Sequence, residues 1–267
     1  ARVSGSKAFA RLKAENAGVQ TSPSYGTVYY DFNCSAEPVN NVLVRKAICL
    51  AIDRQSIIDN VVQVDAQPAY SFLAPGYSVD GKDITEGRES FGLSATADVE
   101  GAQAALAEAG YPNGEGFPVI EYSTNDAGYH VPLAEYLQQA WGDLGITLTI
   151  NKMEWSSFTP ARRAGEYDVA RNGWVMDYND PSNMIELFTT GNGNNDGKYS
   201  NPDFDAAIDA SRVADSAEHF AQLHKAEDIL MEDTGCLPIA YYNDYWLQSP
   251  ALKGTWHSPY GYWYLQY

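Results

Sequence analysis

Apolar residues recur along this chain with two periods, one typical of helices and one typical of strands. Helical spacing predicts helices over residues 5–16, 39–50, 54–64, 99–109, 130–144, 156–164, 203–213 and 217–233. Asp53 and Asp98 stand where N-caps are expected, and Gly110 and Gly145 stand where a glycine ends a helix. Alternating or β-branched runs predict strands over 25–33, 119–123, 146–152, from Tyr167 onward, and over 237–242. Strands that alternate with helices predict an α/β architecture.

Two stretches are predicted to be loops: 67–89, with its prolines and glycines, and the glycine- and asparagine-rich 191–197. Residues 256–267 are dense in aromatic side chains and carry no helical pattern. The chain has no apolar run of about 18 residues, so no membrane span is expected. Its first residues lack the apolar stretch of a signal peptide, and we expect any export signal to lie outside this sequence.

Composition narrows the possible function classes. The 267 residues are 45% hydrophobic and carry a net charge of −18, and such an acidic chain would repel nucleic acid. Cys34, Cys49 and Cys236 form no CxxC pair, which argues against a zinc or iron–sulfur site. Of four histidines only His219 and His224 lie close in sequence, and their spacing of five places them on different faces of a helix. We therefore expect no metal and no cofactor.

The segment 167–181, Y-D-V-A-R-N-G-W-V-M-D-Y-N-D-P, concentrates the candidate chemistry. It delivers a cation at Arg171, a large aromatic side chain at Trp174 and an anion at Asp177 within a few residues. This set suits a ligand that has both charges and a side chain to bury, such as a peptide. From the residues alone, a turn or cap role is the favoured interpretation of Asp177, and Trp174 could equally belong to the core.

Blocks along nearly the whole chain resemble one family. They are P-V-N-N-V-L-V-R-K-A-I-C-L-A-I-D-R (38–54), A-A-L-A-E-A-G-Y-P-N-G (104–114), L-G-I-T-L-T-I-N-K-M-E-W-S-S-F (144–158), the segment 167–181, A-E-D-I-L-M-E-D (226–233) and L-P-I-A-Y-Y (237–242). They are similar to the peptide-binding components of bacterial ABC importers, the extracellular solute-binding proteins of family 5. The resemblance implies a type II periplasmic-binding-protein-like lobe, with a mixed sheet flanked by helices.

Members of that family are about twice as long and trap the ligand between two hinged lobes. The matching blocks correspond to the C-terminal lobe, so the resemblance implies a chain that lacks most of the N-terminal lobe. Residues 1–250 would form the ligand-binding lobe, and 251–267 would be a returning tail that joins the absent N-terminal lobe.

The resemblance also implies roles for individual residues. Asp177 would pair with the α-ammonium group of a peptide, beside Trp174 as a flat apolar wall for a side chain. Tyr178 is a weaker candidate for ligand binding, and a structural role is favoured for it. Arg171, Arg163 and His130 would meet the peptide's C-terminal carboxylate, for which the planar fork of arginine is suited. Cys49 departs from the pattern, because some peptide binders have at this position a lysine that is available for the carboxylate.

The function implied is that of a binding component, not an enzyme. It would bind short peptides, deliver them to the membrane permease subunits of an ABC importer, and work in the periplasm or on the cell surface, lipid-anchored in the full-length protein. One alternative is the same scaffold with a non-peptide ligand such as a nickel chelate, heme or a sugar. A second alternative is a hydrolase that uses carboxylates such as Asp177 and Asp180, although no nucleophile elbow, HExxH or Ser/His/Asp set is visible.

Overall fold

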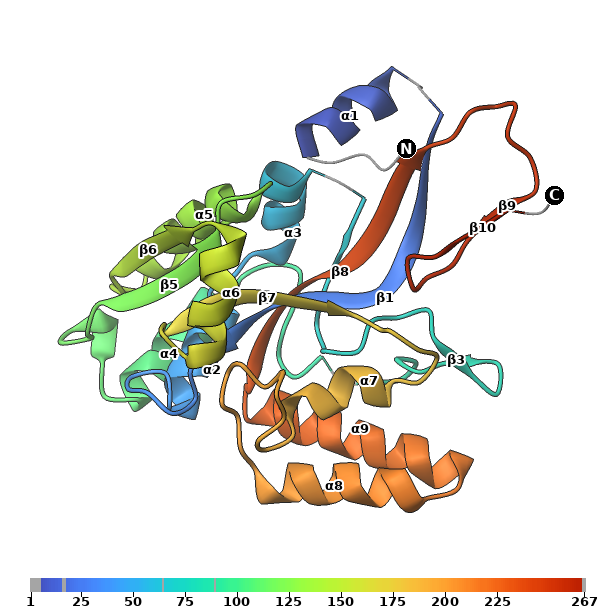
Figure 1. Cartoon of the computed structure of the whole chain (residues 1–267). Coiled ribbons are helices and arrows are strands. Elements are labelled where there is room, and N and C mark those ends of the chain that lie inside the picture. Colours follow the sequence, from blue (N-terminus) through green and yellow to red (C-terminus); the bar gives the residue numbers. More distant parts are fainter. Residues whose placement is uncertain (1–5, 16–17, 64, 89, 266–267) are drawn as a thin grey trace.

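The computed structural model describes residues 6–15, 18–63, 65–88 and 90–265. It confirms the predicted α/β architecture, with helices around one central mixed sheet (Figure 1). The sheet has six strands in the order β2-β8-β1-β7-β5-β6. They are β1 (Val19–Phe32), β2 (Gln67–Pro68), β5 (Ile120–Asn125), β6 (Leu148–Met153), β7 (Val169–Val175) and β8 (Cys236–Leu247). β7, β5 and β6 run parallel to one another, whereas β1 pairs antiparallel with both β7 and β8.

The helices are α1 (Ser6–Ala14), α2 (Val42–Leu50), α3 (Arg54–Ser56), α4 (Val99–Glu108), α5 (His130–Gly142), α6 (Trp155–Ala164), α7 (Ser182–Ile185), α8 (Pro202–Val213) and α9 (Ser216–Glu232). A π-helix, η1 (Ile57–Val62), continues α3, and two short 3₁₀ turns are η2 (Pro112–Gly114) and η3 (Glu186–Phe188). The remaining strands are two hairpins, β3 (Ser78–Val79) with β4 (Lys82–Asp83) and β9 (Thr255–His257) with β10 (Trp263–Leu265). No helix of the described residues is long and apolar enough to cross a membrane.

Local capping explains most helix ends. The side chains of Asp53 and Asp98 accept hydrogen bonds from the backbone N–H groups of Ser56 and Gly101, as the sequence predicted. Gly145 follows α5 with a φ of +83°, a left-handed conformation that favours glycine. α2 begins at Val42 rather than residue 39, because the Asn41 side chain caps it by accepting from Leu43 N–H.

Some predicted boundaries were wrong. β1 begins at Val19, six residues earlier than expected, and β8 continues to Leu247, five residues later. These additions pair with each other at the end of the sheet that Figure 1 shows rising toward α1. The α7–η3 segment was not predicted, and the predicted loop 67–89 contains three two-residue strands.

The C-terminal segment packs on the sheet as a hairpin. His257 stacks on the Trp246 ring at a centroid distance of 4.6 Å, and its Nε2 lies 3.3 Å from the Asp244 carboxylate. Tyr260 contacts the Tyr25 ring edge-on at 5.3 Å. The outer face of the hairpin leaves Trp256 58% exposed. The division into a lobe of 1–250 and a tail of 251–267 stays a prediction.

Candidate functional site

Strand β7 places its side chains alternately on the two faces of the sheet, as the two-residue period of a strand requires. Arg171 and Val175 line a cavity of about 540 Å³ on one face. Asn172 and Trp174 point to the other face, where their partners are Asp31 and Asn183. The candidate site residues that the sequence predicted on β7 therefore lie on opposite faces of the sheet.

Arg171 and His130 are the predicted pair that the structure brings together. The Arg171 guanidinium donates to His130 Nε2 at 2.9 Å, and it also lies over the Trp155 ring at 5.4 Å. Burial, and secondly the charge of Arg171, lower the pKa of His130 to about 3. His130 is thus a neutral imidazole that accepts from Arg171 and leaves the positive charge on the arginine.

Arg171 has no neutralising carboxylate in the part of the chain that the structure describes. No carboxylate of the described residues lies within ion-pair distance of it. A partly buried cation without an anion is costly unless a ligand or solvent supplies one. The site can therefore bind an anionic group with a planar pair of oxygens, such as a carboxylate.

The rest of the cavity comes from segments far apart in the sequence. α5 and the turn before it contribute Leu133 and Tyr129, η1 contributes Val62, and β8 contributes Tyr242 and its neighbours. Gly173 lies beneath Tyr242, whose hydroxyl occupies the space that a Cβ would need. Sequence reasoning missed Tyr129, Trp155 and Tyr242, although Trp155 and Tyr242 lie in blocks that carried the resemblance.

Trp174 and Asp177 are held by one asparagine on the opposite face. Asn183 Oδ1 accepts from Trp174 Nε1 and from the Asp177 backbone N–H, both at 2.9 Å. The Asp177 side chain is exposed, and no described residue pairs with its carboxylate. Tyr178 is 47% exposed and donates to Glu186 at 3.1 Å. Asp177 is therefore available to a cation.

Arg163 does not join Arg171. It is exposed on α6, and its carbonyl oxygen accepts from Lys198 at 2.9 Å. Its neighbour Arg162 points inward, forms an ion pair with Asp196 at 2.8 Å and donates to the Arg171 carbonyl oxygen at 3.2 Å. The predicted cationic pair of Arg171 and Arg163 is not assembled at the cavity.

Beside this ion pair lies a second buried carboxyl group, Asp31. It accepts from Asn172 at 2.6 Å and is 2% exposed. Burial raises the pKa of Asp31 to about 7, although the charge of Arg162 opposes the shift. The neighbouring carboxylate of Asp196 adds to it.

Asp180, the second carboxyl group of the predicted hydrolase pair, is bonded to neighbouring residues. It accepts from the N–H of Ser182, the first residue of α7, and it contacts His219 Nε2 at 3.1 Å. His224 faces the Ile84 carbonyl oxygen instead. Across the described ranges, no three His, Cys, Asp or Glu side chains are arranged to hold a metal ion.

Comparison with known proteins decides the family. Residues 2–196 match the model of the bacterial extracellular solute-binding proteins, family 5, middle region. The chain belongs to this family. As the sequence indicated, this is a family of solute-binding proteins rather than of enzymes.

Relatives of this family 5 protein include oligopeptide-binding proteins. It is 36% identical to the periplasmic oligopeptide-binding protein OppA of Haemophilus influenzae, over 92% of this chain and 46% of that protein. It is 32% identical to the oligopeptide-binding protein OppA of Bacillus subtilis, over 90% of this chain and 44% of that protein. The fold matches Listeria monocytogenes OppA bound to peptide with a TM-score of 0.83 and 27% identity, covering 97% of this chain and 51% of that one. The chain thus spans about half the length of these relatives.

Proposed function

We propose that this chain forms one wall of the peptide-binding cleft in the binding component of a bacterial ABC importer. The observation that carries the proposal is Arg171, a partly buried cation that has no anion among the described residues and faces a cavity of about 540 Å³. The C-terminal carboxylate of a peptide has the charge and the planar shape that this guanidinium binds best.

His130 would keep the site selective for an anion. As a neutral acceptor it holds the Arg171 guanidinium in one orientation, at 2.9 Å, without adding or removing charge. The Trp155 ring on another side of the guanidinium restricts it further. A preorganised cation loses less conformational entropy when the carboxylate arrives.

Asp177 would bind the other end of the ligand. Its exposed carboxylate follows β7, six residues beyond Arg171, which corresponds to roughly 20 Å along an extended strand. Trp174 and Tyr178 flank Asp177 and offer apolar area to a side chain, and Arg163 stays a candidate for a ligand that extends beyond the cavity.

The rest of the proposed cycle involves a second lobe and the membrane permease. A second lobe would close over the peptide, and the closed protein would then deliver it to the permease. We place this work outside the cytoplasm, in the periplasm or on the cell surface, with a lipid anchor in the full-length protein. The relatives named oligopeptide-binding support the ligand class.

The experiment that tests the proposal uses the full-length gene product. Mass spectrometry of material released by mild unfolding should identify short peptides; a chelate, a sugar or no ligand would contradict the proposal. In calorimetry, Arg171→Met should weaken binding of a peptide with a free C-terminus much more than binding of its amidated form. Lys225→Met, an exposed change on α9, is the matched control. Equal losses for both peptides would remove Arg171 from the carboxylate site.

A further inference from the structure

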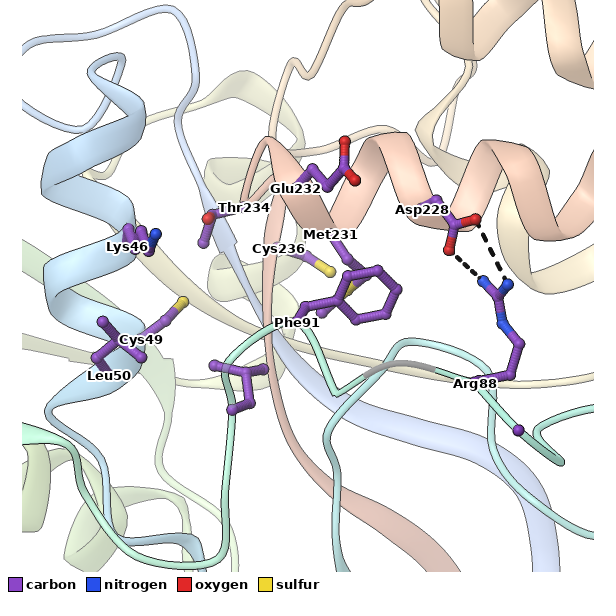
Figure 2. A pocket seen from close by; sticks show the side chains of 12 residues that line it. Lys46, Cys49, Leu50, Arg88, Phe91, Asp228, Met231, Glu232, Thr234 and Cys236 are labelled. Carbon is purple, nitrogen blue, oxygen red and sulfur yellow. Dashed lines mark hydrogen bonds and ion pairs between the residues drawn. The ribbon is translucent and has the colours of Figure 1, made fainter. Parts of the chain in front are cut away.

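A second cavity, of about 510 Å³, opens between α2, α9 and a loop that contributes Gly87, Arg88, Phe91 and Leu93 (Figure 2). Leu50, Leu93, Phe91 and Met231 form most of its apolar wall. None of the described residues that line it also lines the Arg171 cavity. Protein interiors rarely leave voids larger than one water molecule, so a space of this size between packed elements is a candidate binding site.

The deepest part of the cavity is neutral. Cys49 from α2 and Cys236 from the start of β8 lie there, 1% and 0% exposed. Burial raises the pKa of Cys49 to about 12 and raises that of Cys236 as well, so both sulfurs stay protonated. Cys49 lines this cavity and not the Arg171 cavity. The cavity wall formed by the two protonated cysteines suits an uncharged apolar group.

The loop that covers the cavity is anchored to α9. Arg88 donates to the Asp228 carboxylate at 2.5 Å, to Glu227 at 3.1 Å and to the His224 carbonyl oxygen at 3.2 Å. Phe91 has a φ of +53°, a left-handed conformation that is costly for a bulky residue. Because two carboxylates already neutralise Arg88, its charge is not available to a ligand.

Two charges of opposite sign remain free at the mouth. Lys46 on α2 and Glu232 at the end of α9 both line the cavity and are exposed, and Figure 2 shows each on its helix. Neither side chain takes part in an ion pair within the described part of the chain. An apolar interior with one free cation and one free anion at its entrance is complementary to a zwitterion that carries an apolar group.

We propose that this cavity binds a free α-amino acid with a large apolar side chain, its carboxylate at Lys46 and its ammonium group at Glu232. The side chain enters the wall of Leu50, Leu93 and Met231, beside the Phe91 ring. The volume accommodates an aromatic or a branched aliphatic side chain. This site is separate from the proposed peptide cleft and does not depend on it.

Calorimetry on the full-length gene product with three ligands tests each part of the proposal. L-Phenylalanine should bind with a dissociation constant of about 1 mM or lower. L-Alanine, which keeps both charges but lacks the ring, should bind at least about tenfold more weakly. N-Acetyl-L-phenylalaninamide, which keeps the ring but lacks both charges, should bind about fivefold more weakly or worse. No saturable binding of L-phenylalanine, or equal binding of the uncharged analogue, would overturn the proposal.

Variants locate the site. Lys46→Met and Glu232→Gln should each weaken L-phenylalanine binding about fivefold, and Leu93→Trp, which fills the cavity, should abolish it. Lys225→Met, on an exposed position of α9 outside the cavity, should have no effect. Arg171→Met should also leave L-phenylalanine binding unchanged. A loss in Arg171→Met, with none in Lys46→Met, would assign the amino acid to the peptide cleft and refute the second site.

Discussion

Replacing Asp31 with asparagine should make the protein more stable at alkaline pH. Asp31 lies on the sheet face opposite the Arg171 cavity, 2% exposed, where it accepts from Asn172. Its pKa rises from 3.8 to about 7 on folding, chiefly because burial disfavours the charged form. Asparagine fills nearly the same volume and can still accept the hydrogen bond, but it carries no charge.

The direction of this pH dependence follows from the uptake of a proton by Asp31 on folding. Between about pH 4 and pH 7 the folded protein holds a proton on Asp31 that the unfolded chain has released. The free energy of unfolding therefore contains a contribution that is complete below about pH 4 and is lost as the pH rises through about 7. At about 1.36 kcal/mol per pKa unit, a shift of this size corresponds to roughly 4 kcal/mol.

Urea denaturation at several pH values measures this contribution. The difference in unfolding free energy between Asp31→Asn and the parent protein should grow in favour of the variant by roughly 4 kcal/mol between about pH 4 and pH 8. Asp126→Asn, which changes an exposed carboxyl group beyond β5, serves as the control. A difference for Asp31→Asn that does not change with pH would refute the reasoning, because Asp31 would then not bury its charge.

Three further predictions concern the two faces of β7 and the loop after it. Gly173→Ala should lower the free energy of unfolding in urea by about 1–3 kcal/mol, because the new Cβ meets the Tyr242 hydroxyl. Adding Tyr242→Phe should restore much of that stability. An unchanged stability in the single variant, or no recovery in the double variant, would contradict this contact. Asn183→Ala should lower the free energy of unfolding by about 1–3 kcal/mol and shift the tryptophan fluorescence, because it leaves Trp174 Nε1 and the Asp177 N–H without their shared acceptor. An unchanged fluorescence spectrum and an unchanged urea midpoint would argue against the role of Asn183 as that acceptor. His219→Gln should destabilise the protein more at pH 5.5 than at pH 9, which thermal unfolding at the two pH values would measure. Burial alone would lower the pKa of His219, but hydrogen bonds to the Ser211 carbonyl oxygen and to Asp180 raise it. The stabilisation by His219 is therefore present at low pH and lost as the pH rises above the raised pKa.

Local signals predicted much of the fold. Asp53 and Asp98 act as caps because capping needs only a side chain and the next few N–H groups. The first half of β1 escaped prediction because most of Val19–Pro23 is exposed, and these residues are ordered by pairing with β8 more than 200 positions away. No sequence pattern within Val19–Pro23 indicates a strand partner so far away in the chain.

The site was predicted in its chemistry more than in its geometry. Arg171 and His130 were expected to serve one carboxylate, and they lie 2.9 Å apart. The strand period already implies that Arg171 and Trp174, three residues apart, face opposite sides of the sheet. Which of Arg162 and Arg163 points inward could not be predicted, because the choice depends on Asp196, which the fold brings from another loop. Trp155 and Tyr129 meet Arg171 for the same tertiary reason.

Strand β8 is a wall that the two cavities have in common. Cys236 at its start lies at the floor of one cavity, and Tyr242, roughly 20 Å further along the strand, lies in the other. β8 lies between β1 and β2 in the sheet, so one strand carries lining residues of both cavities. If binding in one cavity changed the affinity of the other, the coupling free energy would be equal in both directions.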